Sequence, residues 1–188
     1  MRNECLQEFQ SFFKTDIHKI LKPAITNWLS LKQCVDRVLE QFQLQPLKAY
    51  FIEVVLEDPS LTTDEILSTM NNQFTQIYLE FMSYVLDLMT DFNTLFQINK
   101  PLLHKLKLET AKLLTTICSN FIEINIIRKN DIFQLNHKNA HKVKLEQIYL
   151  CITTHKSFES LCKVPEIGQA CNLFLKTILE FYIELVVI

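Results

Sequence analysis

Residues 73–97 read QFTQIYLEFMSYVLDLMTDFNTLFQ, and this stretch decides the fold class of the chain. Large apolar side chains recur in it at intervals of three and four residues, which places them on one face of an α-helix. They are Phe74, Ile77, Tyr78, Phe81, Met82, Val85, Leu86, Met89, Phe92, Leu95 and Phe96. The residues expected on the polar back are Gln76, Glu80, Asp87, Thr90 and Asp91. The pattern predicts a long amphipathic helix whose apolar face other elements must cover.

The composition of the whole chain favours a nearly all-α fold. Of its 188 residues, 48% are hydrophobic, one is Gly and five are Pro. The dipeptides that usually build hairpin turns, Asn-Gly, Asp-Gly and Gly-Gly, do not occur in the sequence. The length fits one domain, so we expect a single helical domain over residues 1–188, a multi-helix bundle around the long central helix.

Apolar periodicity outlines several helices before the central one. A short first helix carries Cys5, Leu6, Phe9, Phe12 and Phe13 on its predicted apolar stripe. Two capping-box patterns, Ser30 with Gln33 and Thr62 with Glu65, predict helix starts, and Pro46 suits the first position of the helix between them. The acid pairs Asp36/Glu40 and Asp87/Asp91 are expected on solvent faces.

After the central helix, a partner helix is predicted from about residue 102 to residue 121. Only about three residues separate the two, so an antiparallel hairpin is expected. Residues 125–142 lose the helical period and are predicted to form an exposed connection. Short helices are expected over 143–152 and 158–164, and Pro165 is expected to open the last one. At its end, Leu185, Val187 and Ile188 lie off the apolar stripe, which predicts partial exposure and self-association or a bound partner.

Cysteine usage and hydropathy indicate an intracellular protein outside the membrane. The six Cys contain no C-x-x-C pair and are predicted to be reduced thiols, and Cys34, Cys118 and Cys171 fall on apolar stripes. Charged residues near the N-terminus argue against a secretory signal. Residues 173–188 are hydrophobic, but a charged stripe and the short length predict a core helix rather than a membrane span.

No motif for nucleotide or hydrolase chemistry is present. One Gly excludes a Gly-rich phosphate loop, and neither G-x-S-x-G nor H-E-x-x-H occurs. We therefore expect no simple nucleotide-binding or hydrolase function, no cofactor and no small-molecule substrate. The formal net charge of −2 also provides no global positive field to attract nucleic acid.

Two polar groups in the C-terminal half have alternative interpretations. His137 and His141, followed by Cys151 and His155, offer four potential zinc ligands at i, i+4 spacing, but the C-x-x-C half of a zinc finger is missing. A polar loop with incidental His is favoured, so no metal site is predicted. The basic residues between 128 and 144 are suited to phosphate contact, although such charge runs are usually solvated loops.

Trp28, the only Trp, also has two interpretations. It precedes a predicted helix start, where an aromatic ring beside free backbone N–H groups can stack on a base and hold a phosphate. Alternatively, it packs on the first turn as a hydrophobic staple, and its position alone favours this second interpretation.

Eight segments of the chain carry motifs that occur together, in the same order, in one known family. The first four are residues 18–23 (HKILKP), 26–31 (TNWLSL), 34–41 (CVDRVLEQ) and 47–51 (LKAYF). The others are 77–81 (IYLEF), 92–97 (FNTLFQ), 100–106 (KPLLHKL) and 145–150 (LEQIYL). The first four resemble H-K-I-L-x-P, T-R-W-L-S-L, V-x-R-I-L-E-Q and L-K-x-Y-F of the hAT superfamily of transposases and their domesticated relatives, and the likeness covers about residues 5–185.

The resemblance implies an all-helical insertion domain that is set, in the family, inside a ribonuclease H-like catalytic core. The two Asp and one Glu that bind metal in that core, the zinc finger and the C-terminal dimerisation region fall outside the matching segment. The family's Arg-Trp pair handles the transposon end, which implies DNA-binding roles for Trp28, Asn27 and Ser30. Asn27 stands in place of the Arg and lacks its charge.

We therefore expect a transposase-derived, non-catalytic helical domain with residual nucleic-acid binding and, by resemblance, a nuclear location. The alternative is a helical protein–protein interaction module that never contacts DNA.

Overall fold

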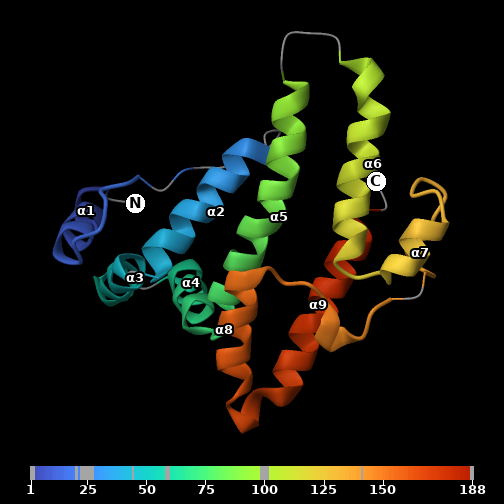
Figure 1. Ribbon diagram of the computed structural model, residues 1–188. Helices are drawn as coiled ribbons and strands as arrows, with labels where there is room; N and C mark the ends of the chain where they lie inside the picture. Colours follow the sequence, from blue (N-terminus) through green and yellow to red (C-terminus); the bar gives the residue numbers. More distant parts are fainter. Residues whose placement is uncertain are drawn as a thin grey trace. The chain divides into compact units, whose positions relative to one another are not determined.

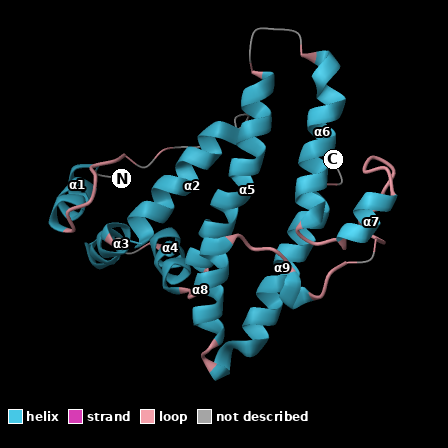
Figure 2. Cartoon of the chain, viewed as in Figure 1, coloured by secondary structure: helices cyan, strands magenta, loops and turns pink. Residues whose placement is uncertain are grey.

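The computed structural model describes residues 3–19, 21, 28–43, 45–57, 60–97, 102–140 and 142–186. Within these ranges the chain is helical, with a single isolated bridge between Ile122 and Lys142 and no β-strand (Figure 1; Figure 2). The all-α class is confirmed. The α-helices are α1 (Asn3–Phe12), α2 (Trp28–Gln43), α3 (Pro46–Glu57), α4 (Leu61–Asn71), α5 (Thr75–Phe96), α6 (Leu103–Ser119), α7 (Ile124–Lys129), α8 (Ile152–Cys162) and α9 (Gly168–Leu185). Two 3-10 helices, η1 (Leu145–Gln147) and η2 (Pro165–Ile167), lie among them.

Helix α5 is the long helix that the apolar period predicts. Its buried apolar residues are Ile77, Phe81, Val85 and Leu86. Glu80, predicted on the polar back, is only 4% exposed, so that prediction is wrong. The reason is its spacing, because position 80 lies three residues after Ile77 and one before Phe81, on the buried face. One Glu80 carboxylate oxygen accepts a 2.8 Å hydrogen bond from Gln76.

The chain forms two compact units, residues Met1–Asp87 (unit 1) and Leu88–Ile188 (unit 2), and α5 runs through the boundary. Each unit is described by itself. The expectation of one domain stays a prediction. The predicted hairpin of α5 and α6 also stays a prediction, because its connecting residues 98–101 lie outside the described part of the chain.

The core of unit 1 joins α1, α3 and α4. Its buried residues are Leu6, Leu47, Tyr50, Phe51 and Met70, and half-buried apolar residues of α1–α4 pack against them. The predicted stripe of α1 fails at its end, since Phe12 is 79% exposed and Phe13 38%. There Lys14 takes a left-handed conformation (φ 55°), and Thr15 N–H donates to the Gln10 carbonyl at 2.9 Å. This Schellman-type stop turns the chain away before the stripe continues.

The helix starts differ from the predicted capping boxes. Helix α2 begins at Trp28, two residues before Ser30, and α4 is capped by Ser60 rather than Thr62. Ser60 and Thr63 form a reciprocal box, in which Thr63 N–H donates to the Ser60 hydroxyl at 3.2 Å and Ser60 N–H donates to the Thr63 hydroxyl at 3.0 Å. A Thr in the third helical position replaces the Glu or Gln that the sequence pattern requires. Pro46 is the first residue of α3, as predicted.

Lys32 joins α2 to α5 within unit 1. Its ammonium bonds Asp36 one turn along α2 and lies 3.0 Å from Asp87 of α5. Ser83 of α5 also donates to Asp36 at 2.7 Å. The predicted solvent-facing acids Asp36 and Asp87 are therefore partners of one cation, whose side chain is only 16% exposed.

Lys32→Met should reduce the stability of unit 1 by about 1 kcal/mol, because Asp87 is mostly exposed and solvent weakens its share. Burial lowers the pKa of Lys32, but its bonds to Asp36 and Asp87 outweigh burial and raise it overall. The contribution should therefore be full at neutral pH and be lost in alkaline solution, as the pH rises through the raised pKa. Urea unfolding of the native chain and of Lys32→Met at several pH values measures this contribution. If the two proteins have equal unfolding free energies at neutral pH and differ only in alkaline solution, this explanation is wrong.

The core of unit 2 is built on α6 and α9. Phe121 and Tyr182 are fully buried, and their rings stack at 5.7 Å between centroids. The Tyr182 hydroxyl donates to the Tyr149 carbonyl at 2.8 Å, and Tyr149 N–H donates to the Asn120 carbonyl at 2.9 Å. These bonds fix the extended segment around residue 149 against both helices. The predicted apolar face of the last helix is confirmed at Cys171, Phe174, Leu175, Ile178, Tyr182 and Val186.

Several boundaries in unit 2 differ from prediction. The stretch 125–142 contains most of α7, and Ile127 and Ile132 are buried, so it is not simply an exposed connection. In place of a helix over 143–152 the chain has only η1, and α8 begins at Ile152. Short apolar runs do not by themselves distinguish helix from packed loop. At the end of the chain the predicted partial exposure is confirmed for Leu185, which is half-buried, and residues 187–188 lie outside the described part.

Cys162 and Cys171 form a disulfide between the end of α8 and the start of α9, so the prediction that all six Cys are thiols is wrong. The turn through η2 brings their Cα atoms to 6.4 Å, a contact that sequence spacing does not reveal. Cys5, Cys34, Cys118 and Cys151 are free, and burial raises the pKa of Cys118 to about 11. Among the described helices, none combines the length and apolar character needed to cross a bilayer.

Candidate functional site

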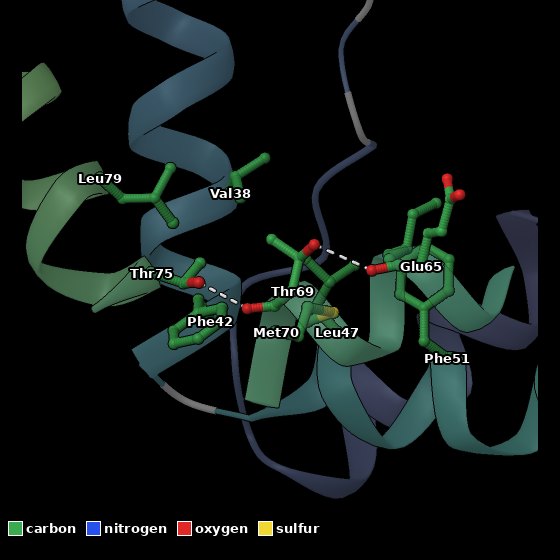
Figure 3. A pocket seen from close by; sticks show the side chains of 10 residues that line it. Val38, Phe42, Leu47, Phe51, Glu65, Thr69, Met70, Thr75 and Leu79 are labelled. Carbon is green, nitrogen blue, oxygen red and sulfur yellow. Dashed lines mark hydrogen bonds between the residues drawn. The ribbon is translucent and has the colours of Figure 1, made fainter. Parts of the chain in front are cut away.

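An apolar pocket of about 510 Å³ lies within unit 1 (Figure 3). Four helices supply its wall. The lining residues are Val38 and Phe42 of α2, Leu47 and Phe51 of α3, Glu65, Ile66, Thr69 and Met70 of α4, and Thr75 and Leu79 of α5. In Figure 3, Phe42 and Leu79 lie on one side and Phe51 on the other, with Met70 and Leu47 between them. Sites of this size bind small molecules or the side chains of a partner.

A tight corner between α4 and α5 shapes one side of the pocket. Asn72 accepts a 2.9 Å bond from Phe74 N–H through its side chain, and its own N–H donates to the Thr69 carbonyl at 3.1 Å. The Thr75 hydroxyl bonds the same carbonyl (Figure 3). The corner therefore holds Thr69, Thr75 and Leu79 at fixed places around the opening.

The pocket wall offers few polar groups to a ligand. The Thr69 hydroxyl donates to the Glu65 carbonyl at 2.8 Å, and the Thr75 hydroxyl donates to the Thr69 carbonyl. Both hydroxyl protons are therefore used inside the protein. Glu65, whose side chain is exposed, is the one charged residue among those that line the pocket. The pocket is an apolar surface with an acidic group at its edge.

The two units differ in charge. Residues 1–87 contain 12 Asp and Glu against 7 Lys and Arg, a formal charge of −5. Residues 88–188 contain 9 Asp and Glu against 12 Lys and Arg, a formal charge of +3. The pocket therefore belongs to an acidic unit, which favours cationic partners and disfavours phosphate at moderate salt.

The residues predicted to contact DNA also belong to the acidic unit. Trp28 is the first residue of α2, and Ser30 is half-buried in the first turn. Asn27 and the Trp28 side chain lie outside the described part, so the stacking and staple interpretations of Trp28 stay open. The sequence did not predict the pocket. Its lining residues lie on four helices and are too far apart in the sequence for any motif to reveal them.

The three potential zinc ligands that the structure describes, His137, Cys151 and His155, do not form a cluster with one another. Cys151 Sγ lies 3.2 Å from the Thr154 hydroxyl, and His155 Nε2 lies 3.2 Å from Glu159. Burial lowers the pKa of His137, and His141 lies outside the described residues. Within the ranges that the structure describes, the only group of three potential metal ligands is Asp16, His18 and Glu40.

The basic residues of 128–144 have mixed surroundings. Arg128 and Lys129 end α7 and are exposed. Lys138 lies 3.4 Å from Glu184, and Lys142 donates to the Lys138 carbonyl at 2.7 Å. Only part of this segment therefore remains available for phosphate.

Over the residues that the structure describes, the protein is all-α and has an apolar pocket in unit 1. Comparison of the chain with protein-family models, curated proteins and solved structures finds no match.

Proposed function

We propose that this chain is a non-catalytic helical binding module whose unit 1 holds an apolar segment of a partner protein in the pocket. The observation that carries the proposal is the pocket itself, an apolar cavity of about 510 Å³ whose two Thr hydroxyls are already bonded within the chain. A small polar ligand needs convergent polar groups for its orientation, and this wall supplies none besides Glu65. Apolar side chains need no such partners.

The occupant that fits best is an amphipathic helix. Such a helix presents apolar residues at i, i+4 and i+7, and it can place them between packed helices such as those that build this pocket. Glu65 and the −5 charge of unit 1 favour a helix with Lys or Arg beside its apolar stripe. The partner is therefore a basic amphipathic segment.

We also propose that the module derives from the insertion domain of a hAT transposase and has no strand-transfer activity. The motifs at 18–23, 26–31 and 34–41 support this origin, and the all-α fold agrees with it. By that resemblance the protein works in the nucleus.

Nucleic-acid binding is the second candidate, and the charge of unit 2 favours it. That unit has a formal charge of +3, and Arg128 and Lys129 are exposed at the end of α7. Titration with hairpin DNA at low and moderate salt tests this candidate. Affinity that falls steeply with salt supports phosphate contact, and absence of binding at low salt excludes it.

The pocket is tested with a blocked peptide that forms a helix with Leu at i, i+4 and i+7 and Lys on its flanks. The native chain should bind it, and Thr69→Trp should weaken binding at least tenfold because the indole fills the opening. Ser68→Trp is the matched control, since Ser68 is exposed on the same helix and does not line the pocket. Fluorescence anisotropy measures binding, and circular dichroism verifies the fold of each variant.

Three results would oppose the proposal. They are no binding by the native chain, equal losses in the two Trp variants, and equal affinity for a peptide with Ser in place of each Leu.

A further inference from the structure

We propose that Asp16, His18 and Glu40 form a divalent-cation site suited to Zn²⁺. Asp16 and His18 lie on the segment after α1, and Glu40 lies on α2. One ligand atom from each falls within 4.8 Å of the other two, and His18 Nε2 is 3.9 Å from a Glu40 carboxylate oxygen. An imidazole nitrogen with two carboxylates is a donor set that zinc accepts, with water in the remaining position.

The geometry requires only small side-chain movements. Ligands of tetrahedral zinc lie at about 2.0–2.2 Å from the metal and so at roughly 3.3–3.6 Å from one another. The three ligand atoms must therefore approach one another by about 1 Å when the metal binds. The side chains are free to make this movement, because Asp16 is exposed and the His18 and Glu40 side chains are each 35% exposed. The same exposure admits the water that completes the coordination.

A fully buried amide holds the segment that carries His18. Gln10 of α1 is 0% exposed, and its Nε2 donates to the His18 carbonyl at 2.8 Å. The same nitrogen donates to Oε1 of Gln41 at 2.9 Å, and Gln41 is 2% exposed and adjacent to Glu40. One side chain thus connects the backbone of His18 to the turn of α2 that supplies Glu40. The bonds of Gln10 therefore fix the backbone that carries His18 next to the turn that carries Glu40.

The Gln10 backbone holds the other end of the segment. Its carbonyl accepts bonds from Thr15 N–H at 2.9 Å and from the Thr15 hydroxyl at 3.2 Å. Asp16 follows directly. Asp16 and His18 are therefore held from both sides by Gln10 before any cation binds, which limits the entropy that binding must remove.

Two buried polar atoms at this support have no partner. They are Oε1 of Gln10 and Nε2 of Gln41. Unpaired buried polar atoms are costly and mark places where water or an ion belongs. The −5 charge of unit 1 further favours a cation at this place.

Zinc chloride titrated into the full chain, followed by calorimetry, tests the site. One equivalent should bind and raise the melting temperature, and His18→Ala, Glu40→Gln and Asp16→Asn should each weaken binding at least tenfold. The Asp16 side chain is exposed, so the Asp16→Asn variant should keep the fold. His155→Ala is the matched control, because His155 pairs with Glu159 at 3.2 Å without a third potential ligand. The zinc affinity of His155→Ala should match that of the native chain.

Cobalt(II) separates this site from the free thiols. At Asp16, His18 and Glu40 the bound cobalt should show no thiolate charge-transfer band, whereas coordination by Cys5, Cys34, Cys118 or Cys151 should produce one. A thiolate band at one equivalent would overturn the proposal. So would native affinity in both His18→Ala and Asp16→Asn, a tenfold loss in His155→Ala, or absence of zinc binding by the native chain.

Discussion

Phe121→Ala should lower the free energy of unfolding by about 3–5 kcal/mol, the usual cost of truncating a fully buried aromatic residue. Phe121 is 0% exposed and stacks on Tyr182, which is also 0% exposed, so the lost ring leaves a cavity at the centre of unit 2. The Phe121 carbonyl also accepts a 3.0 Å bond from Val143 N–H, and this backbone bond survives the substitution. The loss therefore reports packing alone. Urea unfolding followed by circular dichroism measures it.

Leu173→Ala is the control for unit 2. Leu173 lies on α9 and is 65% exposed, so its truncation should change stability by no more than about 0.5 kcal/mol. Similar losses in the two variants would show that the ring stack does not form the core of this unit.

Phe81→Ala should cause a second loss of about 3–5 kcal/mol, this time in unit 1. Phe81 is 1% exposed on α5, between the buried residues Ile77 and Val85. Phe12 provides the control, because it is 79% exposed at the end of α1 and its replacement by alanine should be nearly neutral. A large loss in Phe12→Ala with none in Phe81→Ala would reverse the assignment of core and surface.

The same two core variants test the expectation of a single domain. Because α5 continues through the boundary at Asp87 and Leu88 without a break, we expect Phe81→Ala and Phe121→Ala to shift one common unfolding transition. Two transitions, each shifted by one variant only, would show that the units unfold independently.

Helix α5 shows what the sequence can predict. A period sustained over its whole length identifies its type and most of its buried face, because burial follows from angular position on the helix. Glu80 shows the limit of that method. A glutamate is expected to face solvent because it is charged. The position of Glu80 between Ile77 and Phe81 instead places it on the buried face, where Gln76 donates a hydrogen bond to it.

The features that sequence patterns missed depend on contacts between distant residues. The Ser60 cap uses Thr63, outside the usual capping-box pattern, and the bond between Cys162 and Cys171 depends on the turn through η2. The pocket joins residues from Val38 to Leu79 across four helices, and no local pattern encodes a cavity.

Methyl NMR of the chain labelled at its methionines, titrated with the basic amphipathic peptide, tests directly whether the pocket of unit 1 holds the peptide. The sequence has four Met, and Met70 lines the pocket whereas Met82 and Met89 do not. We expect the Met70 methyl signal to shift in proportion to bound peptide while the signals of Met82 and Met89 keep their positions, and we expect Thr69→Trp to suppress the shift. Saturable binding that moves Met82 or Met89 and leaves Met70 unchanged would contradict binding in this pocket.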